Sequence, residues 1–256
     1  MATDLAAPSR APEQADDLGI DRAFLMMLAR LPVIAAGMVL AAWLGQQLSP
    51  YVPVVLLCGG MILAAVIDGV KFKVPNWLTL SMILAGWGLG TLNSFGVRIG
   101  PGPIDPALQA AFPASGGLSA ALLGSLVAFG LLFPVCALGA MGQGDVKMQT
   151  GFGAWVGALY GSHEGLWTVL YAICAGYIVG GIMGFLMIVL RGQLHRNLSN
   201  FREIAADFRL LLTVGPKAAA QRAQQRRPTW HRLPYGIPLC IGFVGYLAYL
   251  HWFHGG

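Results

Sequence analysis

Seven apolar segments dominate this chain and limit the folds that it can adopt. Hydrophobic residues make up 56% of the sequence and charged residues only 11%, whereas soluble globular chains carry roughly 25% charged residues. The segments lie near residues 25–47, 52–68, 77–92, 117–141, 147–161, 165–190 and 235–253. Because lipid cannot hydrogen-bond to open backbone groups, helices are the default structure for such segments. We therefore predict an all-α, polytopic membrane bundle of about seven transmembrane helices.

Three of the segments are short for a membrane span. The second, third and fifth fall below the roughly 20 residues that a helix needs to cross the hydrocarbon core. We expect their ends to extend into the adjoining loops. Small residues recur in stretches such as GMILAA and AGWGLG, and they would let neighbouring helices approach closely.

The basic residues predict the orientation of this bundle. With seven spans, all but one of the 16 lysines and arginines fall on the same side of the membrane, and the exception is Arg98. Loops rich in lysine and arginine stay in the cytoplasm. We therefore expect a cytoplasmic N-terminus and a C-terminus on the opposite side of the membrane.

Two polar regions flank the predicted spans. Residues 1–22 are polar and rich in alanine and proline, which indicates a disordered cytoplasmic tail ahead of a membrane domain over residues 23–256. Residues 191–232 form a basic cytoplasmic loop in which apolar residues recur at three- and four-residue steps. This spacing predicts one amphipathic helix lying on the inner leaflet. It would either anchor the loop to membrane lipid or dock a substrate.

Two acidic residues stand apart from the other nine. Asp68 and Asp145 each lie at the end of a predicted span, on the cytoplasmic side, while the others fall in the tail or in loops. An acid at membrane depth is costly and marks a functional site by default. Two carboxyl groups can share one proton, so that one acts as base and the other as acid. Such a pair can activate water and protonate a leaving amine, which is the chemistry of peptide hydrolysis.

The glycines before Asp145 suit an approaching substrate chain. In GQGD, residues 142–145, glycine lowers the cost of unusual backbone angles and lets another backbone come close. Purely structural roles also fit both acids. Asp145 could cap the start of its helix, and Asp68 could balance the charge of Lys71 or Lys73.

Three stretches of this sequence resemble one family of membrane proteases. GQGDVKM, at residues 142–148, resembles the GxGD motif of the type IV prepilin peptidases, which are membrane aspartyl proteases that process pilin precursors. DGVKFKVPNW, from Asp68, is similar to the family's first-aspartate motif, in which a short basic stretch and a Pro-Asn pair follow the acid. LPYGIPLCIG, at residues 233–242, is similar to the proline-containing start of the family's last helix.

The resemblance implies an aspartic endopeptidase that removes the leader peptide from prepilins or pseudopilins. Cleavage would take place at the cytoplasmic face of the bacterial inner membrane, without a metal, a cofactor or nucleic acid. Asp68 and Asp145 would be the catalytic residues. The residues that would shape the site are Gly142, Gly144, Lys147, Pro75 and Asn76.

Larger members of this family also methylate the processed pilin, through a cytoplasmic domain with two CxxC pairs. This chain has no CxxC pair and little room between its first two predicted spans. It is therefore similar to the short, peptidase-only form associated with tight-adherence (Flp) pili. Two other classes remain open on the sequence: a proton- or ion-coupled transporter, and a non-catalytic assembly subunit of a pilus or secretion system.

Overall fold

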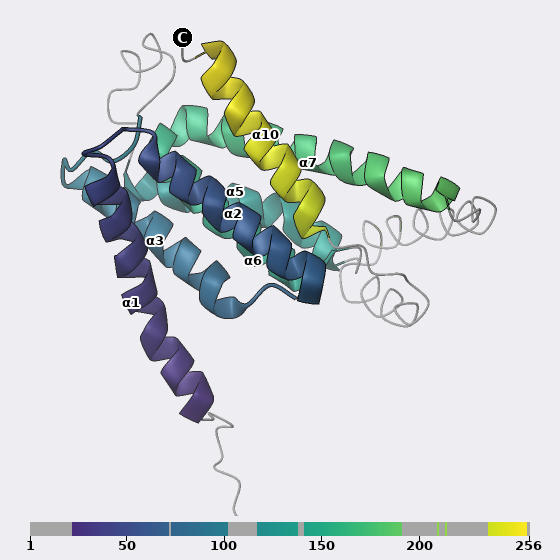
Figure 1. Ribbon diagram of the computed structural model, residues 1–256, viewed down its shortest axis with the longest axis horizontal. Coiled ribbons are helices and arrows are strands. Elements are labelled where there is room, and N and C mark those ends of the chain that lie inside the picture. Colours follow the sequence, from purple (N-terminus) through teal and green to yellow (C-terminus); the bar gives the residue numbers. More distant parts are fainter. Residues whose placement is uncertain are drawn as a thin grey trace, which may run out of the picture.

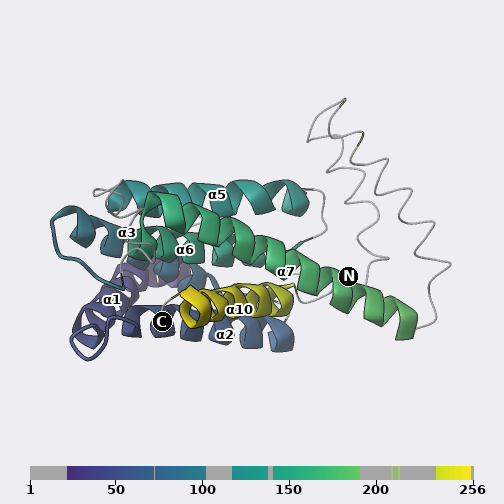
Figure 2. The ribbon, with the colours of Figure 1, turned by 90° about the horizontal axis from the view of Figure 1, so that it is seen from above.

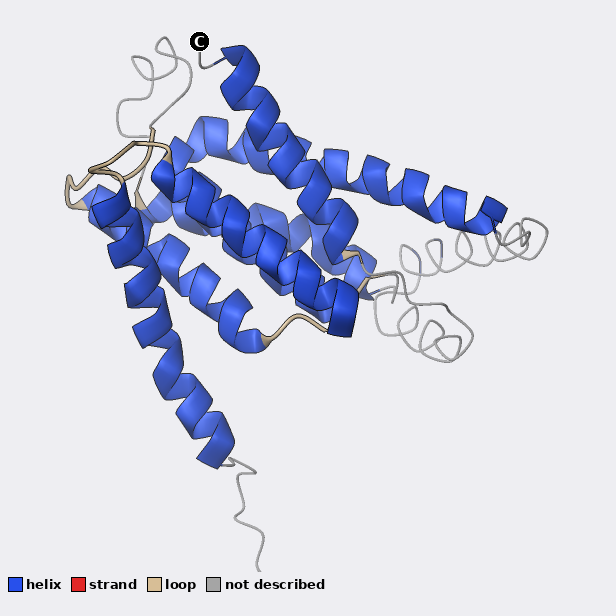
Figure 3. Cartoon of the chain, in the orientation of Figure 1, coloured by secondary structure: helices blue, strands red, loops and turns tan. Residues whose placement is uncertain are grey.

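Helices account for all the regular structure in the described part of the chain. The computed structural model describes residues 22–71, 73–101, 117–137, 141–190 and 235–254, together with Arg209 and Thr213. Within these ranges there is no strand (Figure 3). The seven helices with described bounds are α1 (Arg22–Gly45), α2 (Val52–Lys71), α3 (Asn76–Ser94), α5 (Leu118–Ala137), α6 (Gln143–Tyr160), α7 (Ser162–Leu190) and α10 (Gly236–His254) (Figure 1). The predicted all-α class is confirmed, and each apolar segment coincides with one helix.

Five of these helices are long and apolar enough to cross a membrane. They are α1 from Leu25 onward, α2, α5, α7 and α10 up to Phe253. The remaining two, α3 and α6, contain more polar residues, and α6 has a polar first half with the sequence QGDVKMQT. The prediction of a multi-pass membrane protein is therefore supported, but the count of seven spans is not confirmed.

Large apolar side chains face outward on all five apolar helices. Well-exposed examples, one from each helix, are Val33, Val70, Leu126, Ile178 and Phe253. A water-soluble monomer rarely exposes apolar surface on this scale. Such faces are stable in the hydrocarbon core of a membrane. The same holds for the first half of α1, which projects from the bundle in Figure 1.

The core of the bundle is built around α6. Every residue of α6 from Gly151 to Tyr160 is buried, and the helix packs most extensively against α5 and α3 (Figure 2). Small residues make this closeness possible, as expected from the sequence. A Cβ atom added to Gly124 of α5 would collide with the carbonyl oxygen of Gly153 on α6, and a Cβ atom on Gly86 of α3 would collide with Ala154.

Different helix ends meet at the two ends of the bundle. At one, here called the aspartate end, α2 finishes and both α6 and α10 begin; Gly236 at the start of α10 donates a hydrogen bond to Asp68 of α2. At the other, here called the far end, α3 and α6 finish and α7 begins. There the side chain of Asn93 bonds to the carbonyl oxygen of Ala158.

Two predictions concern regions outside the described residues. These are the disordered tail over residues 1–22, of which only Arg22 is described, and the amphipathic helix within residues 191–232. Arg209 and Thr213 are described in the second region and are helical. Both predictions stay untested, as does the choice between lipid anchoring and substrate docking.

Candidate active site

Asp68 and Asp145 meet at the aspartate end, although 77 positions separate them in the sequence. Asp68 lies in the last turn of α2 and Asp145 in the first turn of α6. Only 6% of Asp68 and 5% of Asp145 is exposed. The two carboxyl groups lie close enough for their charges to act on each other. The predicted pairing of the two span-end acids is thus present in the fold.

The start of α6 determines how Asp145 is held. The N-cap residue is Gly142, in extended conformation (φ −73°, ψ 147°) and without a capping side chain. The carboxylate of Asp145, three residues on, interacts with the backbone N–H of Gly142, as an acidic residue does in half of a capping box. Asp145 is therefore not the N-cap itself. Its Oδ1 atom is buried and has no hydrogen-bond partner among the described residues.

The start of α10 holds Asp68. The backbone N–H of Gly236 donates to Asp68 Oδ2 at 3.2 Å, and no ion pair links Asp68 to Lys71 or Lys73, all three being described residues. A Cβ atom on Gly236 would lie 2.8 Å from Asp68 Oδ2 and 3.1 Å from Asp68 Cβ. Only glycine lets the first turn of α10 come this close to the carboxylate.

Direct contacts join the two aspartate motifs. Gly144 packs against Val74 in the loop between α2 and α3, where an added Cβ would lie 3.3 Å from Val74 Cβ. Lys147 Nζ donates to Asn76 Oδ1 at 3.2 Å. Asn76 is the first residue of α3, and Pro75 before it is the N-cap (φ −71°, ψ 136°). Val74 and Asn76, on either side of Pro75, therefore lie against the first turns of α6, the helix that carries Asp145.

Tyr235 joins this cluster without having been predicted from the sequence. It precedes α10 and is largely withdrawn from solvent; burial, and then the negative charge of Asp145, raise the pKa of Tyr235 above its ordinary value. Its hydroxyl therefore stays protonated and can donate a hydrogen bond near the carboxylates. The only sequence signal was its place beside Gly236 in LPYGIP.

Two further polar side chains near this end were also missed. Gln149 of α6 and Tyr177 of α7 each carry buried polar atoms without a hydrogen-bond partner. Tyr177 lies within electrostatic range of Tyr235. Gln149 could have been noticed as an amide one helical turn after Asp145, at the end of the polar first half of α6.

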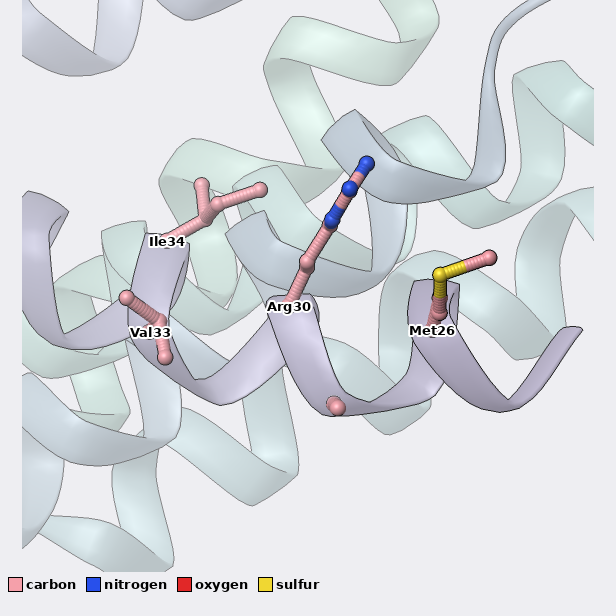
Figure 4. A pocket seen from close by; sticks show the side chains of 5 residues that line it. Met26, Arg30, Val33 and Ile34 are labelled. Atoms are coloured by element: carbon pink, nitrogen blue, oxygen red, sulfur yellow. The ribbon is translucent and has the colours of Figure 1, made fainter. Parts of the chain in front are cut away.

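Other parts of the described chain offer weaker candidates. No three His, Cys, Asp or Glu side chains among the described residues gather to hold a metal ion. A shallow depression on α1 is lined by Met26, Ala29, Arg30, Val33 and Ile34 (Figure 4). All five residues come from one helix that carries neither aspartate. The carboxylate cluster is therefore the candidate site.

Fold and site together define a multi-pass helical membrane protein with a buried pair of carboxyl groups. Residues 55–185, just over half of the chain, match the model of the type IV leader peptidase family. The chain belongs to this family, and the matched region contains both aspartates and all of α3, α5 and α6. Comparisons with curated proteins and with solved structures find no match.

Proposed function

We propose that this protein is an aspartic endopeptidase that removes the leader peptide from type IV, Flp-like prepilins or pseudopilins. Membership of a leader peptidase family supports the reaction class. The observation that carries the aspartic mechanism is the meeting of Asp68 and Asp145, two buried carboxyl groups from separate helices, at one end of the bundle. A pair in this arrangement can hold one proton between them.

The proposed reaction uses the two acids in different roles. Asp145 takes a proton from water while the water oxygen attacks the carbonyl carbon of the scissile peptide bond. Asp68 then gives its proton to the leaving nitrogen as the C–N bond breaks, and the proton on Asp145 returns to Asp68 to restore the starting state. The helix dipoles favour this division, because the first turn of α6 is electropositive and the last turn of α2 is electronegative.

The substrate would reach the two aspartates from the place where Asn76 and Lys147 meet, which we call the rim of the site. Asn76 is exposed and Lys147 only partly buried, and their hydrogen bond joins the start of α3 to α6 two residues after Asp145. Gly142 is exposed at the start of α6 and carries no side chain that would block an extended backbone next to Asp145, while Gly144 lets Val74 pack closely against this turn. Lys147, hydrogen-bonded to Asn76, would hold the two motifs in contact at this rim.

The proposed setting is the cytoplasmic face of the bacterial inner membrane, with the N-terminus in the cytoplasm and the C-terminus in the periplasm. The distribution of lysine and arginine supports this orientation. We propose peptidase activity without methyl transfer, since the sequence has no CxxC pair. Purified protein incubated with mature pilin and S-adenosylmethionine should give no mass increase of one methyl group.

The experiment that tests the proposed function is co-expression with a tagged prepilin. Leader removal is followed by gel shift, and the new N-terminus is identified by mass spectrometry. The wild-type protein should shorten the prepilin, and Asp68→Asn and Asp145→Asn should leave it intact while still inserting into the membrane. Complete processing by either well-expressed variant would overturn the aspartic mechanism.

A further inference from the structure

Gln149 has a buried amide that the fold does not use. Its side chain is fully buried, and in the described part of the chain neither Oε1 nor Nε2 has a hydrogen-bond partner. Buried side-chain amides are normally hydrogen-bonded, because desolvating them without a partner costs free energy. The next residue, Thr150, shows the usual solution, since its hydroxyl donates to the carbonyl oxygen of Val146 at 2.8 Å.

The position of Gln149 on α6 directs it toward Asp145. Residues four apart on a helix are neighbours on one face, with their Cβ atoms about 5–6 Å apart. Helical side chains also lean toward the N-terminus of their helix. A glutamine at position 149 therefore extends back over the turn that carries Asp145. The carboxylate there has one unpartnered atom of its own, the buried Oδ1.

The packing around Gln149 gives no reason for an amide at this position. Neighbours on the same side of α6 make apolar or backbone contacts: Phe152 lies against Phe243 of α10, and Gly153 lies against Gly124 of α5. An unbranched apolar side chain would fill the same volume without a desolvation cost. The amide is therefore better explained by the chemistry at Asp145 than by the stability of the bundle.

We propose that Gln149 is a positioning residue for the water that Asp145 activates. The amide of Gln149 makes no direct hydrogen bond to the carboxylate; instead the attacking water lies between the two residues, donating one O–H to Asp145 Oδ1 and the other to the carbonyl oxygen of Gln149. A water molecule held in this way has partners on both residues, as buried waters require. This role rests on the proposed peptidase function and extends it to a residue outside the two aspartate motifs.

The depth of Gln149 in the bundle indicates that its hydrogen-bond partner is water and not the backbone of a substrate. Gln149 is one helical turn further into the bundle than Asp145, and none of its surface is exposed. A leader peptide arriving at the rim would meet Lys147 and Asn76 first. Loss of the amide should therefore slow the chemical step and leave binding of the leader intact.

The test compares Gln149→Met and Gln149→Leu with the wild-type protein on a synthetic prepilin peptide in detergent. We expect kcat to fall about 10- to 100-fold, within the range for groups that assist general base catalysis, with KM changed less than about threefold. The melting temperature should be equal to or higher than that of the wild type. Thr150→Val is the matched control, because it removes a neighbouring polar group that α6 already satisfies; its kcat should stay close to the wild-type value.

Each other outcome would overturn the proposal. A wild-type kcat in both variants would show that the amide is not used, and a raised KM with unchanged kcat would make it a contact to the peptide. A lowered melting temperature, or failure of both variants to fold, would assign the amide to the fold. These failures differ from failure of the proposed function, in which the wild-type protein itself would not cleave the peptide.

Discussion

The polar side chains at the two ends of the bundle differ in how completely they are hydrogen-bonded. At the far end, Asn93 Oδ1 accepts from the backbone N–H of Ile99 at 2.9 Å, and Asn93 Nδ2 donates to the carbonyl oxygen of Ala158 at 2.7 Å. His251 Nδ1 bonds to the carbonyl oxygen of Leu247 at 2.8 Å, so its Nε2 accepts from the hydroxyl of Tyr160 at 3.2 Å. These side chains tie α3, α6 and α10 together.

At the aspartate end, several polar atoms are left without such partners. Within the described ranges, Asp145 Oδ1 and both amide atoms of Gln149 are buried and unpaired, and Asp68 accepts a hydrogen bond from the backbone N–H of Gly236. Natural proteins accept such costs mainly where function requires them. At the far end the polar groups hold helices together, while at the aspartate end they remain available, as the proposed peptidase reaction requires.

The largest effect should come from removing either carboxylate. Asp68→Asn and Asp145→Asn keep the size of the side chain but cannot exchange a proton, so kcat/KM for a prepilin peptide should fall about 1,000-fold or more. Glu164→Gln is the matched control, since it removes an acid from the first turn of α7 at the far end. Its kcat/KM should stay within about twofold of the wild type. Equal losses in all three variants would remove the distinction between the ends.

A smaller loss is expected from Gly236→Ala. The added Cβ would press on Asp68 Oδ2 and Cβ, at 2.8 and 3.1 Å, so either α10 or the carboxylate must move. A displacement of this kind should lower kcat by about 10- to 100-fold. Gly245→Ala on the same helix meets nothing within 4 Å and should retain full activity. Wild-type kcat in Gly236→Ala would mean that close contact with α10 is not needed.

Lys147→Met should have a still smaller effect on cleavage. It removes the 3.2 Å hydrogen bond from Lys147 to Asn76 at the rim, and a typical hydrogen bond contributes about 0.5–1.5 kcal/mol net. We expect kcat/KM to fall about 2- to 10-fold. Arg98→Gln, a charge removal at the far end, serves as control. Identical losses in the two variants would attribute the effect to net charge instead of the contact.

The least effect on cleavage, with a clear effect on stability, is expected from Asn93→Leu. The change removes two hydrogen bonds and leaves the Ile99 N–H and the Ala158 carbonyl oxygen without partners. The free energy of unfolding should drop by about 2–4 kcal/mol, seen as a lower melting temperature in detergent. The kcat of the remaining folded protein should match the wild type. A fall in kcat without destabilisation would contradict the assignment of the far end to stability.

Much of this organisation is predictable from the sequence because it depends on composition and order along the chain. The apolar segments gave the helices with small errors at their ends: α6 begins at Gln143, before the predicted 147, and α2 continues to Lys71, past the predicted 68. Alternation of the spans was sufficient to place Asp68 and Asp145 at one end. These are local properties, or consequences of simple topology.

The remaining features depend on packing between distant helices, which the sequence pattern does not encode. The sequence on either side of Gly236 does not indicate that its backbone N–H donates to Asp68, 168 positions earlier. The unpaired state of the Gln149 amide likewise depends on what α5, α7 and α10 place around α6. Tyr235 was part of a recognised motif, but its proximity to Asp145 follows only from how α10 docks.

The bond between Gly236 and Asp68 also has a consequence for biogenesis. Ribosomes deliver the chain in order, so α2 enters the membrane long before α10 is made. During that interval Asp68 lacks the backbone donor that holds it in the finished bundle. The aspartate pair can reach its final geometry only when the last described helix arrives, so the proposed site is complete only after the rest of the bundle is in place.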